Sequence, residues 1–338
     1  MYRLTQPALY VCASLLVLSG CEAPPPLAGG VDVSQNVTPQ TRTMRPSPRN
    51  APGNKALLYV VTDENFAFVA DYPSGQTLHR ISFGGNVNGT GICSNASGQV
   101  FMTAQAEQGT YPTGYIYEFA HGGTSPIATL EETGHTPTDC SVDPTTGNLA
   151  VTSTSEANCR GNAVAIYPGA KGTPTIYEAP GFACLAGAAY DDQGNLFLVG
   201  SGGVTDLSYV IEELPRGSSN LIDIALNEQL ICVREECRSA IQWYGKYLAI
   251  TKPSEARNSP IVYRVQVSGS VGKVVGATTF HGNFGAGSGT GSLVRGGKIL
   301  LTYRPNNVAL WSYPAGGKAI GILKGFKGYP HLGLTVSQ

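Results

Sequence analysis

The sequence predicts an all-β protein, a six-bladed β-propeller whose blades are four-stranded antiparallel sheets. Three observations support this prediction. Strand-like segments recur at a near-constant interval, glycine-containing turns separate them, and no segment has the period of a long amphipathic helix. The nearest helical candidate, residues 221–230, is short and flanked by strand-like sequence. A repeat of this size cannot bury its own apolar face, so we expect the copies to stack side by side.

Residues 1–20 have the pattern of a signal peptide. Arg3 supplies a positive charge, and the apolar run after it is too short to span a membrane. The run ends in Leu18-Ser19-Gly20-Cys21, which resembles a bacterial lipobox. This resemblance implies cleavage before Cys21 and acylation of that residue. The alternative is an ordinary secretory signal cleaved near Ala23.

Residues 21–53 are expected to form a disordered, proline-rich tether, because they contain few large apolar residues and no periodicity. Glu22 stands where lipoproteins retained at the inner membrane usually carry aspartate. We therefore expect a lipid-anchored protein of the bacterial cell envelope, at the outer membrane and facing the periplasm or the surface. Its contact with the membrane would be through the lipid anchor only.

Residues 54–338 have a uniform composition, and we expect them to form one domain. The third strand of each repeat ends in an apolar or aromatic residue near a turn. These residues are Tyr72, Phe119, Tyr167, Leu214, Val265 and Tyr313. They lie 47, 48, 47, 51 and 48 residues apart, which is the length of a four-stranded propeller blade.

The two ends of this domain complete the sixth blade. Residues 333–337 match the innermost strand of a blade, and residues 56–61 match the strand that follows it. We expect the C-terminal strand to pair with the N-terminal strands and close the ring, which removes the open sheet edges through which chains associate. We expect a monomer.

Two predicted inner hairpins, at residues 143–151 and 191–198, carry a family resemblance. Asp143 with Gly147-Asn148, and Asp191 with Gly194-Asn195, resemble the inner turns of NHL-type six-bladed propellers. That group includes gluconolactonase-like and regucalcin-like enzymes and streptogramin lyases. The resemblance covers residues 54–338 and concerns architecture. The Glu-Gly-Pro motif that supplies a metal ligand in the gluconolactonase-like enzymes is missing here.

Charged residues make up 13% of the chain, and the formal net charge is -1. This balance offers no electrostatic attraction to nucleic acid or to an anionic membrane surface. We therefore expect no nucleic-acid partner.

Six cysteines remain after the signal peptide and the acylated Cys21 are set aside. An even number in an exported domain favours disulfides, and the lack of a Cys-x-x-Cys pair argues against zinc. The repeat map suggests three pairs: Cys93 with Cys140, Cys159 with Cys184, and Cys232 with Cys237.

Two kinds of glycine-containing segment invite a ligand interpretation. The carboxylates of Asp143 and Asp191 suggest calcium, but one or two oxygens per turn are too few, so we interpret them as turn caps. The loop at residues 285–291 resembles a phosphate-binding loop only in composition, because no helix follows it.

Propeller geometry gathers the loops that enter each blade, and those between its second and third strands, on one rim. Three histidines fall there: His135, His281 and His331. The charged candidates for a binding rim are Asp139, Glu107, Glu156, Arg160, Asp206, Arg257 and Arg304.

The favoured function is a non-catalytic binding or scaffold module that takes a small molecule, a glycan or a protein at this rim. The alternative is a lyase or lactone hydrolase in which a rim histidine acts as general base. No cofactor is predicted, and only the alternative would involve a metal ion.

Overall fold

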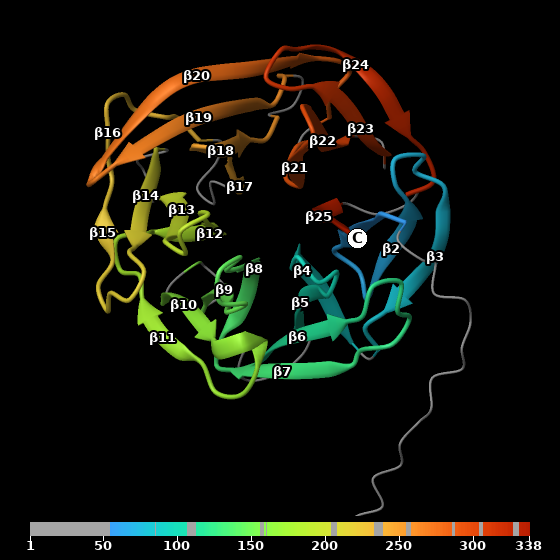
Figure 1. Ribbon diagram of the computed structural model, residues 1–338, viewed down its shortest axis with the longest axis horizontal. Coiled ribbons are helices and arrows are strands. Elements are labelled where there is room, and N and C mark those ends of the chain that lie inside the picture. The colour runs from blue at the N-terminus through green and yellow to red at the C-terminus, as the bar shows by residue number, and fades with distance from the viewer. Residues whose placement is uncertain are drawn as a thin grey trace, which may run out of the picture. The chain divides into compact units, whose positions relative to one another are not determined.

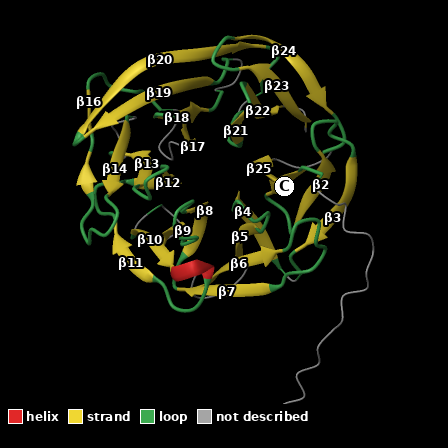
Figure 2. Cartoon of the chain, in the orientation of Figure 1, coloured by secondary structure: helices red, strands yellow, loops and turns green. Residues whose placement is uncertain are grey.

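The regular structure consists almost entirely of β-strands (Figure 2). The computed structural model describes residues 55–84, 86–106, 113–155, 159, 161–203, 208–232, 239–254, 258–285, 288–303, 307–326 and 331–338. These residues belong to one compact unit, Pro48–Gln338. The helical segment drawn in Figure 2 is a three-residue 3₁₀ turn, Pro168–Ala170.

Four separate sheets contain four antiparallel strands each. The first is β25 (His331–Ser337), β1 (Leu57–Thr62), β2 (Phe66–Asp71) and β3 (Thr77–Ser82). The second is β4 (Val87–Ser94), β5 (Val100–Ala106), β6 (Thr113–Phe119) and β7 (Ala128–Thr133). The third is β8 (Thr136–Val142), β9 (Leu149–Thr154), β10 (Asn162–Tyr167) and β11 (Thr175–Glu178). The fourth is β12 (Cys184–Tyr190), β13 (Leu196–Ser201), β14 (Tyr209–Leu214) and β15 (Ile222–Asp223).

The remaining strands form one nine-stranded sheet. It contains two antiparallel sets of four. One is β17 (Ala240–Tyr244), β18 (Tyr247–Lys252), β19 (Ile261–Ser268) and β20 (Val271–His281). The other is β21 (Ser292–Arg295), β22 (Lys298–Tyr303), β23 (Asn307–Ser312) and β24 (Gly316–Leu323). A short parallel pairing of β20 with β24 joins the two sets, and β16 (Ala225–Leu226) pairs in parallel with the other end of β20.

The sheets follow one another around a ring (Figure 1), which confirms the all-β, propeller-like fold. The count of six units depends on dividing the nine-stranded sheet at the short β20–β24 pairing. Closure occurs as predicted, since β25 pairs antiparallel with β1 from Leu57–Ser337 to Thr62–His331.

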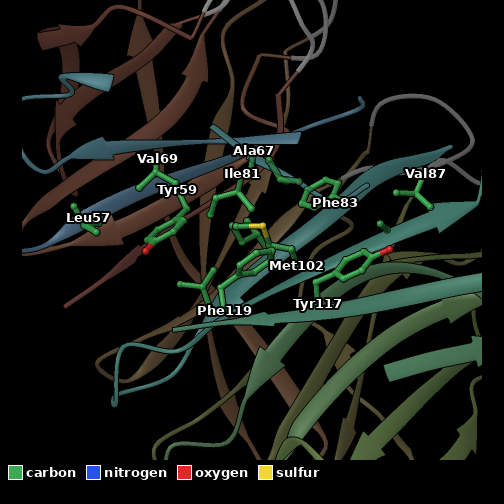
Figure 3. Close-up of a cluster of buried hydrophobic side chains, with 14 residues drawn as sticks. Leu57, Tyr59, Ala67, Val69, Ile81, Phe83, Val87, Met102, Tyr117 and Phe119 are labelled. Atoms are coloured by element: carbon green, nitrogen blue, oxygen red, sulfur yellow. The ribbon is translucent and has the colours of Figure 1, made fainter. Parts of the chain in front are cut away.

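Packing between the sheets explains why second strands are deeply buried, even where they contain polar residues, as in β9. Strands β1, β9 and β13 are buried at every position, because a neighbouring sheet covers each of their faces. The outermost strand β3 alternates between exposed and covered residues, because one of its faces meets water. Figure 3 shows one such interface, where Tyr59 and Val69 of the first sheet approach Met102 and Phe119 of the second.

Two predicted disulfides are confirmed. Cys93 of β4 is bonded to Cys140 of β8, and Cys159 is bonded to Cys184 of β12. The first pair is separated by 47 residues, one repeat length, so it joins equivalent strands of neighbouring sheets. Cys232 is also disulfide-bonded, and its predicted partner Cys237 lies outside the described residues.

The aspartate turns are capped as predicted. Asp143 accepts hydrogen bonds from the backbone N–H and hydroxyl of Thr145, and Asp191 accepts from the backbone N–H groups of Gln193 and Asn195. Gly147 and Gly194 have positive φ angles, +75° and +86°, which glycine adopts without strain. The aspartate carboxylates are therefore used within their own turns.

Candidate functional site

The innermost strands of the ring line an axial channel of about 1280 Å³. They are β25, β4, β8, β12, β17 and β21, and their labels surround the centre of Figure 1. An innermost strand is hydrogen-bonded to a partner strand on only one side, so its other edge presents backbone N–H and C=O groups toward the axis. The channel wall is therefore polar even where its side chains are small.

Hydroxyl groups add to this polarity and are held in place by one another. Thr90 bonds Thr103 at 2.9 Å, and Thr138 bonds Thr152 at 2.8 Å. Ser94 of β4 shares a hydrogen bond of 2.8 Å with Thr335 of β25, and Ser292 shares one of 2.7 Å with Thr251. Because these bonds fix the oxygen positions, the wall offers preorganised hydrogen-bonding groups to a ligand.

Small residues let the innermost strands approach closely. Counting back from the turn that follows each innermost strand, equivalent positions hold Gly91, Asp139, Gly187, Ala240, Gly291 and Gly333. A Cβ atom at residue 91 would lie 2.7 Å from the Asp139 Cα, and one at residue 333 would lie 3.0 Å from Ile92 Cγ2. Backbone and core atoms occupy the space that a side chain would need there.

Asp139 is the one acidic residue in this ring of small residues. A Cβ atom at Gly187 would lie 2.8 Å from Asp139 Oδ2, so the carboxylate reaches across to β12. It accepts hydrogen bonds from the backbone N–H groups of Cys140 and Ala188. Burial raises the pKa of Asp139 to about 7, although these two hydrogen bonds act in the opposite direction. Near neutral pH this group therefore changes between hydrogen-bond acceptor and donor.

The charged residues in the described channel wall are acidic. Asp63 and Asp139 line the channel, and no lysine, arginine or histidine is found among the described lining residues. Low-dielectric walls around like charges concentrate their field. The two described carboxylates, when ionised, would attract a positively charged group.

The structure does not bring the predicted rim residues together in one place. Asp139 lies in the channel wall. His135 lies between β7 and β8 with a buried Nδ1 that has no hydrogen-bond partner in the described structure, and His281 is exposed at the end of the outermost strand β20. His331 is the first residue of β25. The others lie outside the described residues: Glu107, Glu156, Arg160, Asp206, Arg257 and Arg304.

Neither His135 nor His281 joins Asp139 in lining the channel. Within the described ranges, no group of three or more His, Cys, Asp or Glu side chains is arranged to hold a metal ion. The same part of the chain contains no helix long and apolar enough to cross a membrane.

Sequence reasoning placed Asp139 on a rim and missed the channel wall to which it belongs. A signal was present: five of the six equivalent positions hold glycine or alanine, and only this one holds a functional group.

No protein-family model matches the chain, and no curated protein matches it. A solved structure from Bacteroides caccae, described as a protein of unknown function, is similar in fold. It is 8% identical, with a TM-score of 0.58, and the match covers 84% of this chain and 99% of that one. At this identity the similarity concerns the fold alone.

Proposed function

We propose that this chain is an exported binding module whose ligand occupies the axial channel. The observation that supports this most is the channel itself, with fixed hydroxyl groups, exposed strand edges and the Asp139 carboxyl in one wall. Its volume of about 1280 Å³ admits a sugar, an amino acid or the end of a short peptide or glycan. The ligand class is therefore small, polar, and neutral or cationic.

A bulky side chain in the channel should abolish binding. Ala186 lies at the β-bulge of β12, lines the channel and is partly exposed between two buried neighbours, so A186W places an indole in the channel. Ligand-observed NMR with a panel of monosaccharides, disaccharides and amino acids provides the measurement. We expect at least one compound to bind the unmodified chain, and its affinity for A186W should be at least ten-fold weaker.

The matched control is I176W, which adds an indole on the exposed outermost strand β11 and should leave binding unchanged. Equal binding by A186W and the unmodified chain would contradict a channel site, as would the absence of any binder in the panel.

The proposed setting is the bacterial cell envelope, with Cys21 as the lipid anchor and a six-bladed, NHL-like propeller as the exported domain. The support is the lipobox-like sequence Leu18-Ser19-Gly20-Cys21. Detergent-phase partitioning and fatty-acid labelling test it. The unmodified chain should enter the detergent phase and take up label, whereas C21S should be soluble or unprocessed. Identical partitioning of the two would rule out the anchor.

One observation favours the enzyme alternative. A carboxyl with a pKa of about 7 in a polar channel suits general acid–base catalysis near neutral pH, as a lyase or a lactone hydrolase requires. On this alternative, Asp139 is a better candidate base than His281, which lies on the outermost strand β20.

A further inference from the structure

Two carboxylates face each other in the outer part of the fourth sheet. Glu212 of β14 and Asp223 of β15 are directly opposite in the antiparallel pairing of these strands. Like charges in this position repel and destabilise a sheet. The β14–β15 pairing extends over two residue pairs and is continued by one backbone hydrogen bond, from Ile224 N–H to the Ile211 carbonyl, so the backbone bonding that opposes the repulsion is short.

Burial of Glu212 makes the pairing of the two carboxylates less favourable still. Glu212 is 4% exposed, and its Oε2 atom has no hydrogen-bond partner among the described residues. A buried carboxylate oxygen without a partner is unfavourable, because it has lost its water and gained nothing in exchange.

Both carboxylates approach Gly181, in the segment between β11 and β12. A Cβ atom at residue 181 would lie 1.9 Å from Glu212 Oε1 and 3.9 Å from Asp223 Oδ1. Any side chain at this position would overlap the Glu212 carboxylate, so glycine provides the room that the two oxygens occupy. Gly181 and Asp223 are themselves exposed, which leaves this place open to water and small ions.

We propose that Glu212 and Asp223 bind a divalent cation, calcium, beside Gly181. Calcium prefers carboxylate oxygens at 2.3–2.6 Å, tolerates irregular geometry and accepts water in its remaining positions. The cation would supply the missing partner of Glu212 and turn a repulsive strand pair into a bridged one. With two side-chain ligands, the affinity should be in the weak range typical of extracellular modules, about 10⁻⁴–10⁻³ M.

This site is separate from the channel and does not depend on the proposed binding function. Neither carboxylate lines the channel in the described structure, and the expected consequence concerns stability. Calcium should hold β15 against β14 and raise the melting temperature of the whole unit.

Thermal unfolding of the full chain at pH 8 tests the site, after removal of bound metal with EDTA. Burial and the nearby Asp223 charge raise the pKa of Glu212 to about 7, so most Glu212 carboxyls are ionised at this pH. Addition of 10 mM calcium chloride should raise Tm by about 3 °C, with a smaller rise for magnesium chloride. E212Q and D223N should each lose most of this rise.

The matched control is E213Q, which removes a charge from the adjacent, oppositely facing position of the same strand. It should keep the full calcium response. If E212Q folds poorly, D223N still tests the calcium site, because Asp223 is exposed and its substitution should not disturb the core. An equal calcium response in D223N and the unmodified chain, or no response in the unmodified chain, would overturn the proposal.

Discussion

Deletion of residues 331–338 should abolish cooperative folding. These residues carry β25, which supplies the innermost strand of the first sheet and pairs with β1 over its full length. Leu334 and Val336 are each 5% exposed, and burial of each is worth about 1.5–3 kcal/mol. A folded domain has about 5–15 kcal/mol of stability in total, so the loss of this strand removes a large share of it.

The deletion also opens the ring. The six residues of β1 are completely buried, and without β25 their backbone groups would form an exposed edge. Contacts to the second sheet would be lost as well, since Ser337 bonds His121 Nδ1 at 2.7 Å and Thr335 bonds Ser94.

Differential scanning calorimetry and limited proteolysis provide the measurement. The truncated chain should show no cooperative transition and should be digested throughout. Removal of Gln338 alone, an exposed residue after the strand, should leave the transition close to that of the unmodified chain. A cooperative transition in the truncated chain would show that the ring does not depend on its closure.

The fold could be predicted because its signals are local and periodic. The Asp143 and Asp191 turns mark the same point of the repeat, and residues such as Phe119 and Tyr167 end the third strands. The 47-residue separation of Cys93 and Cys140 equals one repeat, so their pairing followed from the period. In a repeat protein each unit packs against its neighbours in sequence, so the fold can be recognised from the repeat period.

The repeat marks the position of Asp139 in the sequence, but not the β-bulge beside it. The pairing of β8 with β9 shifts between Pro137 and Asp139, so Thr138 is an extra residue. Side chains alternate along a strand, and one extra residue moves all later side chains to the opposite face. The same shift occurs in β4 and β12, and the sequence carries no local sign of it, so the channel wall was not recognised from the sequence.

The parallel pairing of β20 with β24 was also not predicted. It joins the outermost strands of two neighbouring units at Phe280–Gly317 and His281–Lys318. Strand β20 has 11 residues, long enough to pass the end of its own sheet. Outermost strands keep a free edge, and which free edges meet depends on strand length and twist, properties that a repeat pattern does not contain.

Stability should fall as pH rises from about 4.5 to about 7, and Glu132 should contribute to this change beside Asp139 and Glu212. This residue of β7 is 7% exposed, and its Oε1 accepts a hydrogen bond of 3.1 Å from the Tyr167 hydroxyl. Burial raises the pKa of Glu132 from 4.5 to about 7, against the smaller opposite effect of that hydrogen bond.

The sign follows from proton counting. Between these two pKa values the folded chain keeps the proton on Glu132, whereas the unfolded chain has released it, so rising pH favours unfolding. The full effect is at most about 3 kcal/mol, because each unit of pKa difference corresponds to about 1.4 kcal/mol. Below about pH 4 both states are protonated, and the contribution vanishes.

The substitution E132Q should therefore stabilise the protein at pH 8 and have little effect at pH 4. Glutamine has nearly the same shape, still accepts the Tyr167 hydrogen bond through Oε1, and cannot ionise. Urea unfolding at both pH values gives the free energies of unfolding, and we expect E132Q to exceed the unmodified chain by about 1–3 kcal/mol at pH 8.

The matched control E178Q removes an exposed carboxylate from β11 and should change neither value by more than about 0.5 kcal/mol. Parallel pH profiles for E132Q and the unmodified chain would contradict the assignment, since a difference between the two that does not vary with pH cannot come from a proton held by Glu132.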